Sequence, residues 1–86
     1  PHYTAALNEL GSIHSARGAY ERAVPYFEAA VAAEPATAHY HLNLAIAYEE
    51  LGRFDAARQQ YLTFVELAPP ALAARAAEIR KRLTGY

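Results

Sequence analysis

The chain matches itself when it is shifted by 34 residues, and this internal repeat limits most strongly what the chain can fold into. Small residues align with small ones, aromatic residues with aromatic ones, and helix breakers with helix breakers. The aligned pairs are Leu10 with Leu44, Gly11 with Ala45, His14 with Tyr48, Gly18 with Gly52, Tyr20 with Phe54, Ala23 with Ala57, Phe27 with Tyr61, Val31 with Val65, and Pro35 with Pro69. Such a repeat predicts a row of similar units, each packed against the next.

Each unit has the pattern of two helices joined by a turn. Apolar residues recur at helical spacing on both sides of Gly18, which stands where a helix commonly ends in a left-handed residue. Pro35 ends the second helix, and Thr37 is expected to cap the helix that begins near Ala38. Pro25 falls inside the first turns of the second helix, where we expect a small kink and a continuous helix after it.

The predicted core follows from these stripes. Alanine, the best helix former, supplies 21 of the 86 residues and favours close helix packing over a bulky core. Gly11 and Ala45 are expected to let the second helix of each pair approach the first, opposite Ala23 and Ala57 respectively. The expected core stripes are Leu7, Leu10 and His14, then Tyr20, Ala23, Phe27, Ala30 and Val31, and in the second unit Leu44, Tyr48 and Leu51, then Phe54, Ala57, Tyr61, Phe64 and Val65.

Residues 72–84 predict one more amphipathic helix, which caps the row because the bulky Ile79-Arg80 pair leaves no place for a further helix to dock closely. Phe64 is expected to pack against small residues of this helix. The expected apolar stripe is Leu72, Ala76, Ile79 and Leu83, the expected partners of Phe64 are Ala73, Ala76 and Ala77, and the residues placed on the opposite side are Arg75, Glu78 and Arg82.

The spacing resembles the tetratricopeptide repeat family, whose 34-residue motif has Leu-Gly in the first helix, a Gly-x-aromatic turn, Ala and an aromatic residue in the second helix, and a closing Pro. The departures are His14, Leu7, His41 and Phe64. The resemblance implies an all-α solenoid of antiparallel helix pairs, with five helices in right-handed superhelical stacking. It divides the single domain, residues 1–86, into repeats at 4–37 and 38–71 and a capping helix at 72–84.

No residue constellation predicts catalysis, and we expect neither an enzyme nor a cofactor or metal site. The absence of cysteine excludes a thiol nucleophile and a Cys-based zinc site. His39 and His41 point to nearly opposite sides of a helix, and the adjacent carboxylates Glu49 and Glu50 diverge in the same way. A net charge of -1 and a pI near 6.5 give no support to nucleic-acid binding, and no apolar run is long enough for membrane insertion.

The resemblance instead implies a protein–protein interaction module that binds a peptide segment or a partner helix in a concave groove. Leu42 and Ile46 would provide apolar contacts, the glutamates would favour some positive charge, and a free Asn43 side chain would bond a peptide backbone. The groove residues carried over from the motif are Asn8, Glu9, Ser12, His39, Leu42, Asn43, Ile46, Glu49 and Glu50, with Ala5, Ser15 and Ala16 beside them and Ala77 with Arg80 or Lys81 from the cap. A solvated inner face without a ligand remains an equal alternative.

Two further expectations concern the setting of the module. The basic C-terminal helix is an alternative site of self-association, in which it pairs with the acidic body of a second molecule as a homo-oligomer. The chain begins with Pro1, contains no Met and has seven Arg for one Lys, which favours a piece of a larger bacterial protein. Of the chaperone-binding carboxylate clamp known in the family, only Asn43 is matched, so we do not expect chaperone C-termini as ligands.

Overall fold

The computed structural model describes residues 2–85, which form five α-helices and one short 3-10 helix without any strand. The predicted all-α fold is therefore confirmed for this part of the chain. The helices are α1 (His2–Ala16), α2 (Tyr20–Ala33), α3 (Ala38–Glu50), α4 (Phe54–Leu67) and α5 (Ala73–Thr84), with the 3-10 turn η1 (Pro70–Leu72) leading into α5.

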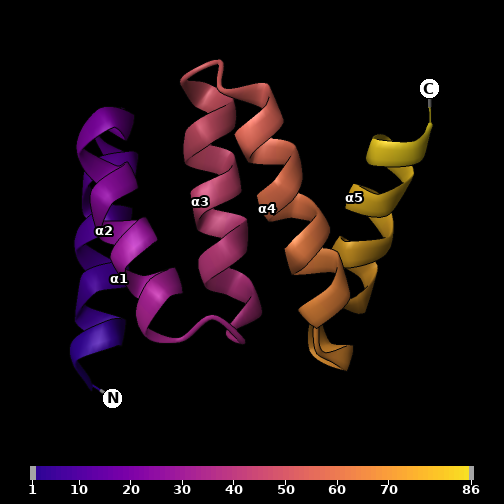
Figure 1. Cartoon of the computed structure of the whole chain (residues 1–86), viewed down its shortest axis with the longest axis horizontal. Helices are drawn as coiled ribbons and strands as arrows, with labels where there is room; N and C mark the ends of the chain where they lie inside the picture. Colours follow the sequence, from indigo (N-terminus) through magenta and orange to yellow (C-terminus); the bar gives the residue numbers. More distant parts are fainter. Residues whose placement is uncertain (1, 86) are drawn as a thin grey trace.

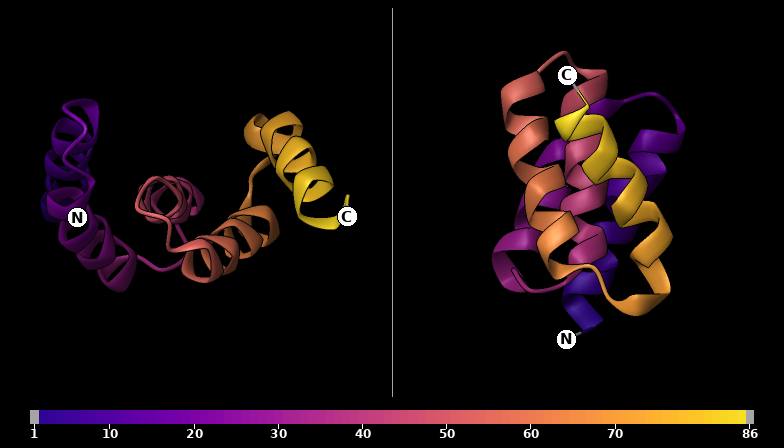
Figure 2. Two further views of the ribbon diagram at one scale, coloured as in Figure 1. Left: turned by 90° about the horizontal axis from the view of Figure 1, so that it is seen from above. Right: turned by 90° about the vertical axis from the view of Figure 1, so that its right-hand side faces the viewer.

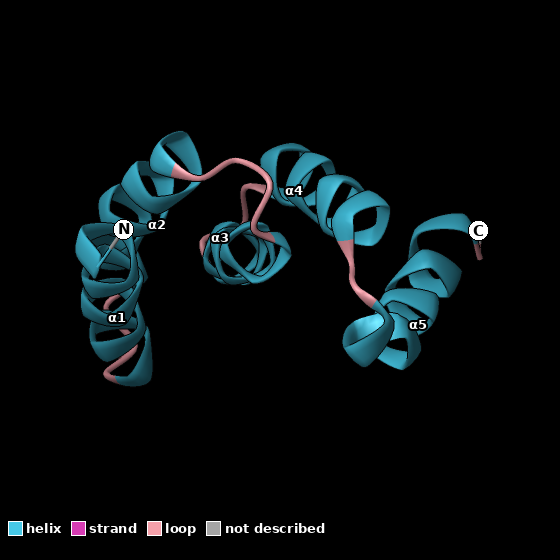
Figure 3. Ribbon diagram, turned by 90° about the horizontal axis from the view of Figure 1, so that it is seen from below, coloured by secondary structure: helices cyan, strands magenta, loops and turns pink. Residues whose placement is uncertain are grey.

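The five helices form one curved row in the order of the sequence (Figure 1). Within the row α1 packs on α2 and α3 on α4 as antiparallel pairs, α2 joins the two pairs by packing on α3, and α5 packs on α4. Seen along the helices, α2 and α4 lie on the outer side of the curve, whereas α1, α3 and α5 line its inner side (Figures 2 and 3). The row measures 34 × 28 × 19 Å.

The turns inside the two pairs have the same geometry, as the repeat predicts. Gly18 and Gly52 have φ angles of 75° and 77°, a conformation that costs other residues strain because of their Cβ atoms. The amide of Ala19 donates to the His14 carbonyl oxygen at 2.9 Å, and the amide of Arg53 donates to the equivalent carbonyl at 2.9 Å. Each turn therefore satisfies the last carbonyls of its first helix in the same way.

The connection between the pairs begins and ends where the sequence predicts. α2 stops at Ala33, ahead of Pro35, and α3 begins directly after Thr37. Thr37 is the N-cap residue of α3, as predicted, but its side chain makes no capping hydrogen bond, and its hydroxyl donates to a Glu34 carboxylate oxygen at 3.4 Å. α2 continues through Pro25 as one helix, which confirms the expected continuity, and the expected small kink at Pro25 stays a prediction.

The core consists of two clusters, one on each side of α3. The first joins α2 to α3, and the second joins α3, α4 and α5. Their buried members are Ala23, Val24, Phe27, Leu44 and Ala47 in the first cluster, and Ala38, Leu42, Ala45, Ala57, Tyr61, Phe64, Ala76 and Ile79 in the second. Because α3 faces both clusters, it has buried residues around most of its circumference.

Two predicted core residues are exposed instead. Leu10 is 42% exposed, although its repeat partner Leu44 is 2% exposed, because α2 covers α3 on that side and no described residue covers α1 in the same way. Phe54 is 66% exposed. Its repeat partner Tyr20 packs at the edge of the first cluster, where Leu51 also packs. The position equivalent to Leu51, 34 residues later, is Gly85, which has no side chain that could cover Phe54 in the same way.

The close approach at Gly11 differs from the expected one. A Cβ atom at Gly11 would lie 2.6 Å from the Phe27 ring, so the glycine makes room for an aromatic ring and not for Ala23. Gly11 is buried and Phe27 is 2% exposed, which leaves the ring little freedom to move away. The position of the Phe27 ring therefore leaves no room for a side chain at Gly11.

The C-terminal helix closes the second cluster with the predicted stripe. Ala76 and Ile79 are buried against Phe64, and Leu72 and Leu83 pack at the edge of the same cluster. Of the three alanines expected to receive Phe64, only Ala76 does so, since Ala73 and Ala77 are exposed. A helix that presents one narrow stripe to a large ring buries only the residues nearest its centre line.

Candidate functional site

The inner side of the row carries three shallow hollows. Their volumes are about 370, 310 and 190 Å³, at or below the lower end of pockets that enclose small ligands. The first, between α1 and α3, is lined by Ala5, Asn8, Glu9, Ser12, His39 and Tyr40. The second, over α2, is lined by Ser12, Ser15, Ala16, Tyr20, Phe27, Asn43 and Ile46, and the third, between α3 and α5, by Leu42, Ile46, Tyr61, Arg75, Glu78, Ile79 and Arg82.

The structure brings most of the predicted groove residues together along this inner side. Neighbouring hollows share a residue, since Ser12 lines the first and second and Ile46 lines the second and third. Glu50 is exposed and lines none of the three, and Glu49 lies beyond the third hollow, in contact with α4 and α5. The groove residues carried over from the motif are thus adjacent in space along α1 and α3, except for these two glutamates.

The contribution of α5 to this side differs from the prediction. The expected residues, Ala77 with Arg80 or Lys81, line none of the three hollows. Arg75, Glu78 and Arg82 line the third hollow in their place, so they face the inner side. The rotation of α5 follows from Ile79, because burying this large side chain against Phe64 turns the neighbouring charged residues toward the groove.

Asn43 is not free, contrary to the sequence-based expectation. Its side-chain amide donates to the Asn8 side-chain oxygen at 2.9 Å, across the gap between α3 and α1. The two amides together still present the Asn8 NH2 group as a donor and the Asn43 carbonyl oxygen as an acceptor. The pair therefore offers a backbone amide the same two complementary groups that a neighbouring strand offers.

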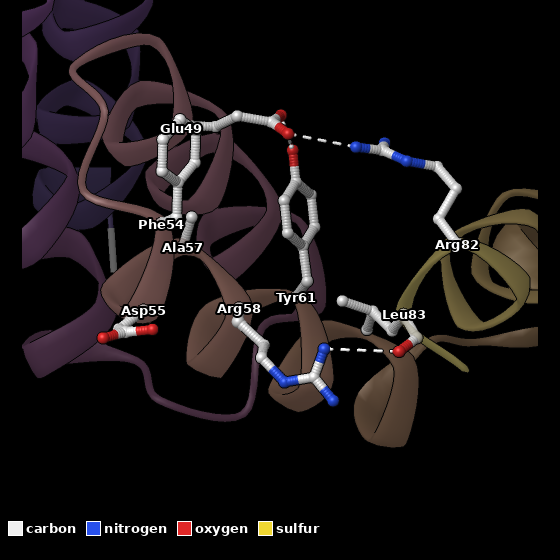
Figure 4. A pocket seen from close by; sticks show the side chains of 8 residues that line it. All are labelled: Glu49, Phe54, Asp55, Ala57, Arg58, Tyr61, Arg82 and Leu83. Atoms are coloured by element: carbon white, nitrogen blue, oxygen red, sulfur yellow. Dashed lines mark hydrogen bonds and ion pairs between the residues drawn. The ribbon is translucent and has the colours of Figure 1, made fainter. Parts of the chain in front are cut away.

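A polar network joins α3, α4 and α5 beside the third hollow (Figure 4). The Tyr61 hydroxyl donates to one Glu49 carboxylate oxygen at 2.7 Å, and Arg82 donates to the other at 3.0 Å. Burial and the hydrogen bond to Glu49 raise the pKa of Tyr61 to about 12, and the carboxylate also raises the pKa of Arg82. The Arg82 guanidinium lies 5.7 Å from the centre of the Tyr61 ring. α5 is thus attached to the rest of the chain by a charge pair as well as by its apolar stripe.

The same network changes the predicted electrostatics of the groove. Glu49 is paired with Arg82, so its negative charge is largely compensated within the chain. Of the predicted acidic groove residues, Glu9 is the one that lines a hollow without a described cationic partner. The self-association hypothesis assigned the basic helix to a second molecule, whereas Arg82 is engaged by the chain's own α3.

A fourth hollow, of about 270 Å³, lies on the other side of Tyr61, at the open end between α4 and α5 (Figure 4). It is bordered by the exposed Phe54 ring, and Arg58 closes one edge by donating to the Leu83 carbonyl oxygen at 3.3 Å. None of the sequence-based expectations included this hollow, because it exists only through the angle at which α5 leaves α4.

The three histidines whose side chains are described, His14, His39 and His41, make separate contacts and do not converge. His41 is buried, and its Nε2 lies 2.7 Å from the Pro35 carbonyl oxygen while its Nδ1 lies 2.7 Å from Oε1 of Gln60. His14 stacks on Tyr26, and His39 is exposed. Among residues 2–85, no three His, Asp or Glu side chains come together to hold a metal ion.

The comparisons agree with the fold. The described helices include none that is long and apolar enough to span a membrane. No curated protein matches the chain significantly. The family model of the tetratricopeptide repeat matches residues 8–72, more than half of the chain and all of the three central helices. The chain therefore belongs to the tetratricopeptide repeat family.

Proposed function

We propose that the inner side of the row binds an extended segment or a helix of a protein partner. Tetratricopeptide repeats generally mediate protein–protein interaction and are typically non-catalytic. The observation that carries the proposal is the continuity of the three hollows through Ser12 and Ile46, which forms one trough along the row. Hollows of this size suit the side chains of one elongated ligand better than a compact small molecule.

The proposed ligand has two apolar side chains separated by Ile46. The second hollow has Phe27 and Ile46 in its lining, and the third has Leu42 and Ile79. A backbone amide of the ligand lies against the Asn8–Asn43 pair, and a basic side chain lies near Glu9 in the first hollow. This preference for positive charge is narrower than the sequence predicts, because Glu49 is already paired.

In the same proposal the chain divides into two repeats, residues 4–37 and 38–71, and a capping helix at 72–84. The first helix of each repeat and the cap contribute to the trough. The second helix of each repeat lies on the outer side of the row, where it supports the trough residues from behind (Figure 3).

Substitution of Ser12 tests the proposal without disturbing the core. Ser12 is exposed and lines two hollows, so Ser12→Trp obstructs the trough, whereas Gln59→Trp places the same ring at an exposed position of α4 that lines none of the described hollows. A random peptide library displayed on phage is selected against the native chain. Affinities of the selected peptides are then measured by fluorescence anisotropy for all three proteins.

We expect the selected peptides to share two apolar positions, with Ser12→Trp weakening binding at least tenfold and Gln59→Trp by less than twofold. A tenfold loss corresponds to about 1.4 kcal/mol. Peptides without an apolar pair, or an affinity unchanged by Ser12→Trp, would show that the trough is not the binding site. Circular dichroism confirms that both variants keep the helical fold.

A further inference from the structure

The first helix carries an apolar stripe on a side that no described residue covers. The stripe, called here the α1 stripe, consists of Tyr3, Ala6, Leu10 and Ile13, which follow one another at spacings of three and four residues along one line of the helix. Tyr3 is 69%, Leu10 42% and Ile13 45% exposed. Large apolar side chains in line on one exposed helix face are typical of a surface that another molecule covers.

Two residues of opposite charge border the α1 stripe. Glu9 lies on the side of the trough, since it also lines the first hollow, and Arg17 continues the stripe four residues after Ile13. The amide of Arg17 donates to the His14 carbonyl oxygen at 3.1 Å, so Arg17 follows the direction of the helix. Both charged residues are exposed, and neither makes an ion pair with another residue of the described range 2–85.

A second copy of the chain complements this surface when the two α1 helices lie antiparallel. If Leu10 of each copy faces Ile13 of the other, then Ala6 of each copy faces Arg17 of the other. Arg17 lies within one helical turn, about 5.4 Å along the axis, of Glu9 of the opposite copy. The long stem of Arg17 then packs over the small Ala6, and its guanidinium reaches the Glu9 carboxylate. Two-fold symmetry forms each of these contacts twice.

Other pairings of the same stripe bring like charges together. A parallel pair places the two Arg17 side chains beside each other and the two Ala6 side chains face to face, which leaves a gap between the helices. An antiparallel pair shifted so that Leu10 faces Ala6 brings the two Glu9 carboxylates within one helical turn of each other. Of these three arrangements, the first antiparallel one is favoured because it alone pairs opposite charges.

We infer that the α1 stripe is a dimer interface, which takes the α1 helix of a second copy of the chain in antiparallel orientation. Leu10 and Ile13 form its centre, and Tyr3 lies toward its outer ends. One helix face from each copy buries less than the roughly 1,200 Å² of a standard interface, so the dimer is weak, with a Kd no tighter than about 1 μM. The dimer forms without the basic α5 and independently of peptide binding in the trough.

Sedimentation velocity over a range of concentrations around the micromolar range measures this association. Leu10→Glu places a charge at the centre of the interface. Leu62→Glu is its matched control, because Leu62 is 40% exposed on α4 and lines none of the described hollows. We expect Leu10→Glu to raise the Kd of the dimer at least about tenfold and Leu62→Glu to change it less than about twofold. Circular dichroism checks that both variants keep the helical fold.

An exchange of charges tests the antiparallel orientation. Glu9→Arg places arginines against each other at both ends of the interface, and Arg17→Glu does the same with glutamates. Each variant alone should therefore raise the Kd about fivefold or more. An equimolar mixture of the two variants pairs opposite charges at both ends and should form a mixed dimer with about the native Kd. The double variant Glu9→Arg with Arg17→Glu should also dimerise like the native chain.

Three results would overturn the inference. A native chain that stays monomeric at all concentrations shows that a second copy does not cover the stripe. A dimer that Leu10→Glu leaves intact places the contact elsewhere on the molecule. A mixture of Glu9→Arg and Arg17→Glu that remains monomeric contradicts the antiparallel pairing. A native dimer that Leu10→Glu disperses, together with a mixed dimer of the two charge variants, supports the inference whether or not the trough binds a peptide.

Discussion

Replacing Gly11 by alanine tests the packing argument at the closest approach of α1 and α2. The added Cβ atom would lie 2.6 and 2.7 Å from two carbons of the Phe27 ring, well inside van der Waals contact. Phe27 is 2% exposed, so the ring moves only if its neighbours move with it. Overpacking of this kind costs about 1–3 kcal/mol.

Helix propensity acts in the opposite direction. An alanine in place of a glycine inside a helix stabilises it by about 1 kcal/mol. Taking the middle of the overpacking range, we expect Gly11→Ala to lower the free energy of unfolding by about 1 kcal/mol. At the equivalent position of the second unit, Ala45→Gly loses both propensity and a buried methyl group, for a total loss of about 1–2 kcal/mol. Both exchanges are thus destabilising, although they run in opposite directions.

Urea unfolding followed by circular dichroism measures both changes. The double variant Gly11→Ala with Phe27→Leu is the control, because a smaller side chain makes room for the new methyl group. The cost of Gly11→Ala should then shrink, with a coupling energy of at least about 0.5 kcal/mol between the two sites. The reasoning is refuted if Gly11→Ala alone raises stability by the full propensity gain of about 1 kcal/mol.

Two other predictions follow from the turns and the tyrosines. Gly52→Ala should cost about 1 kcal/mol of unfolding free energy through backbone strain alone, since φ is 77° and an added Cβ meets nothing within 4 Å; an unchanged urea midpoint would contradict this. Burial and hydrogen bonds to glutamates raise the folded-state pKa of both Tyr48 and Tyr61 to about 12 from 10.0. The unfolded chain therefore releases these protons first, and stability should fall as the pH rises from 10 to 12. Tyr61→Phe should reduce this fall in urea unfolding at pH 9 and pH 11, and an equal fall in both proteins would show that Tyr61 does not contribute.

The helices and turns were predictable from the sequence because they depend on local backbone properties. Gly18 adopts a positive φ angle at low cost, and Pro35 cannot continue a helix, wherever the rest of the chain lies. Repetition of these signals after 34 residues predicted the helix pairs, and the helical spacing of apolar residues predicted most of the core. The hydroxyl of Thr37 is the local exception, since it donates to the Glu34 carboxylate and accepts no hydrogen bond from the amides of α3.

The inner side of the row was predictable only in part. The residues of α1 and α3 that line it follow from their place in the repeat, so Asn8, Ser12 and Ile46 were found from the sequence. The Asn43–Asn8 bond was not, because it joins residues 35 apart, and neither was the pairing of Glu49 with Arg82. Such contacts depend on the distance and angle between helices, which no local pattern contains.

The sequence by itself determined which segments are helical, where they turn and which of their faces are apolar. Only the tertiary structure decided which apolar faces are covered: Leu44 is buried by α2, whereas Leu10 has the same place in its own helix and remains exposed. It also decided that α5 turns Arg75 and Arg82 toward the trough. The physical reason is that helix formation depends on neighbouring residues in the chain, whereas burial and charge pairing depend on neighbours in space.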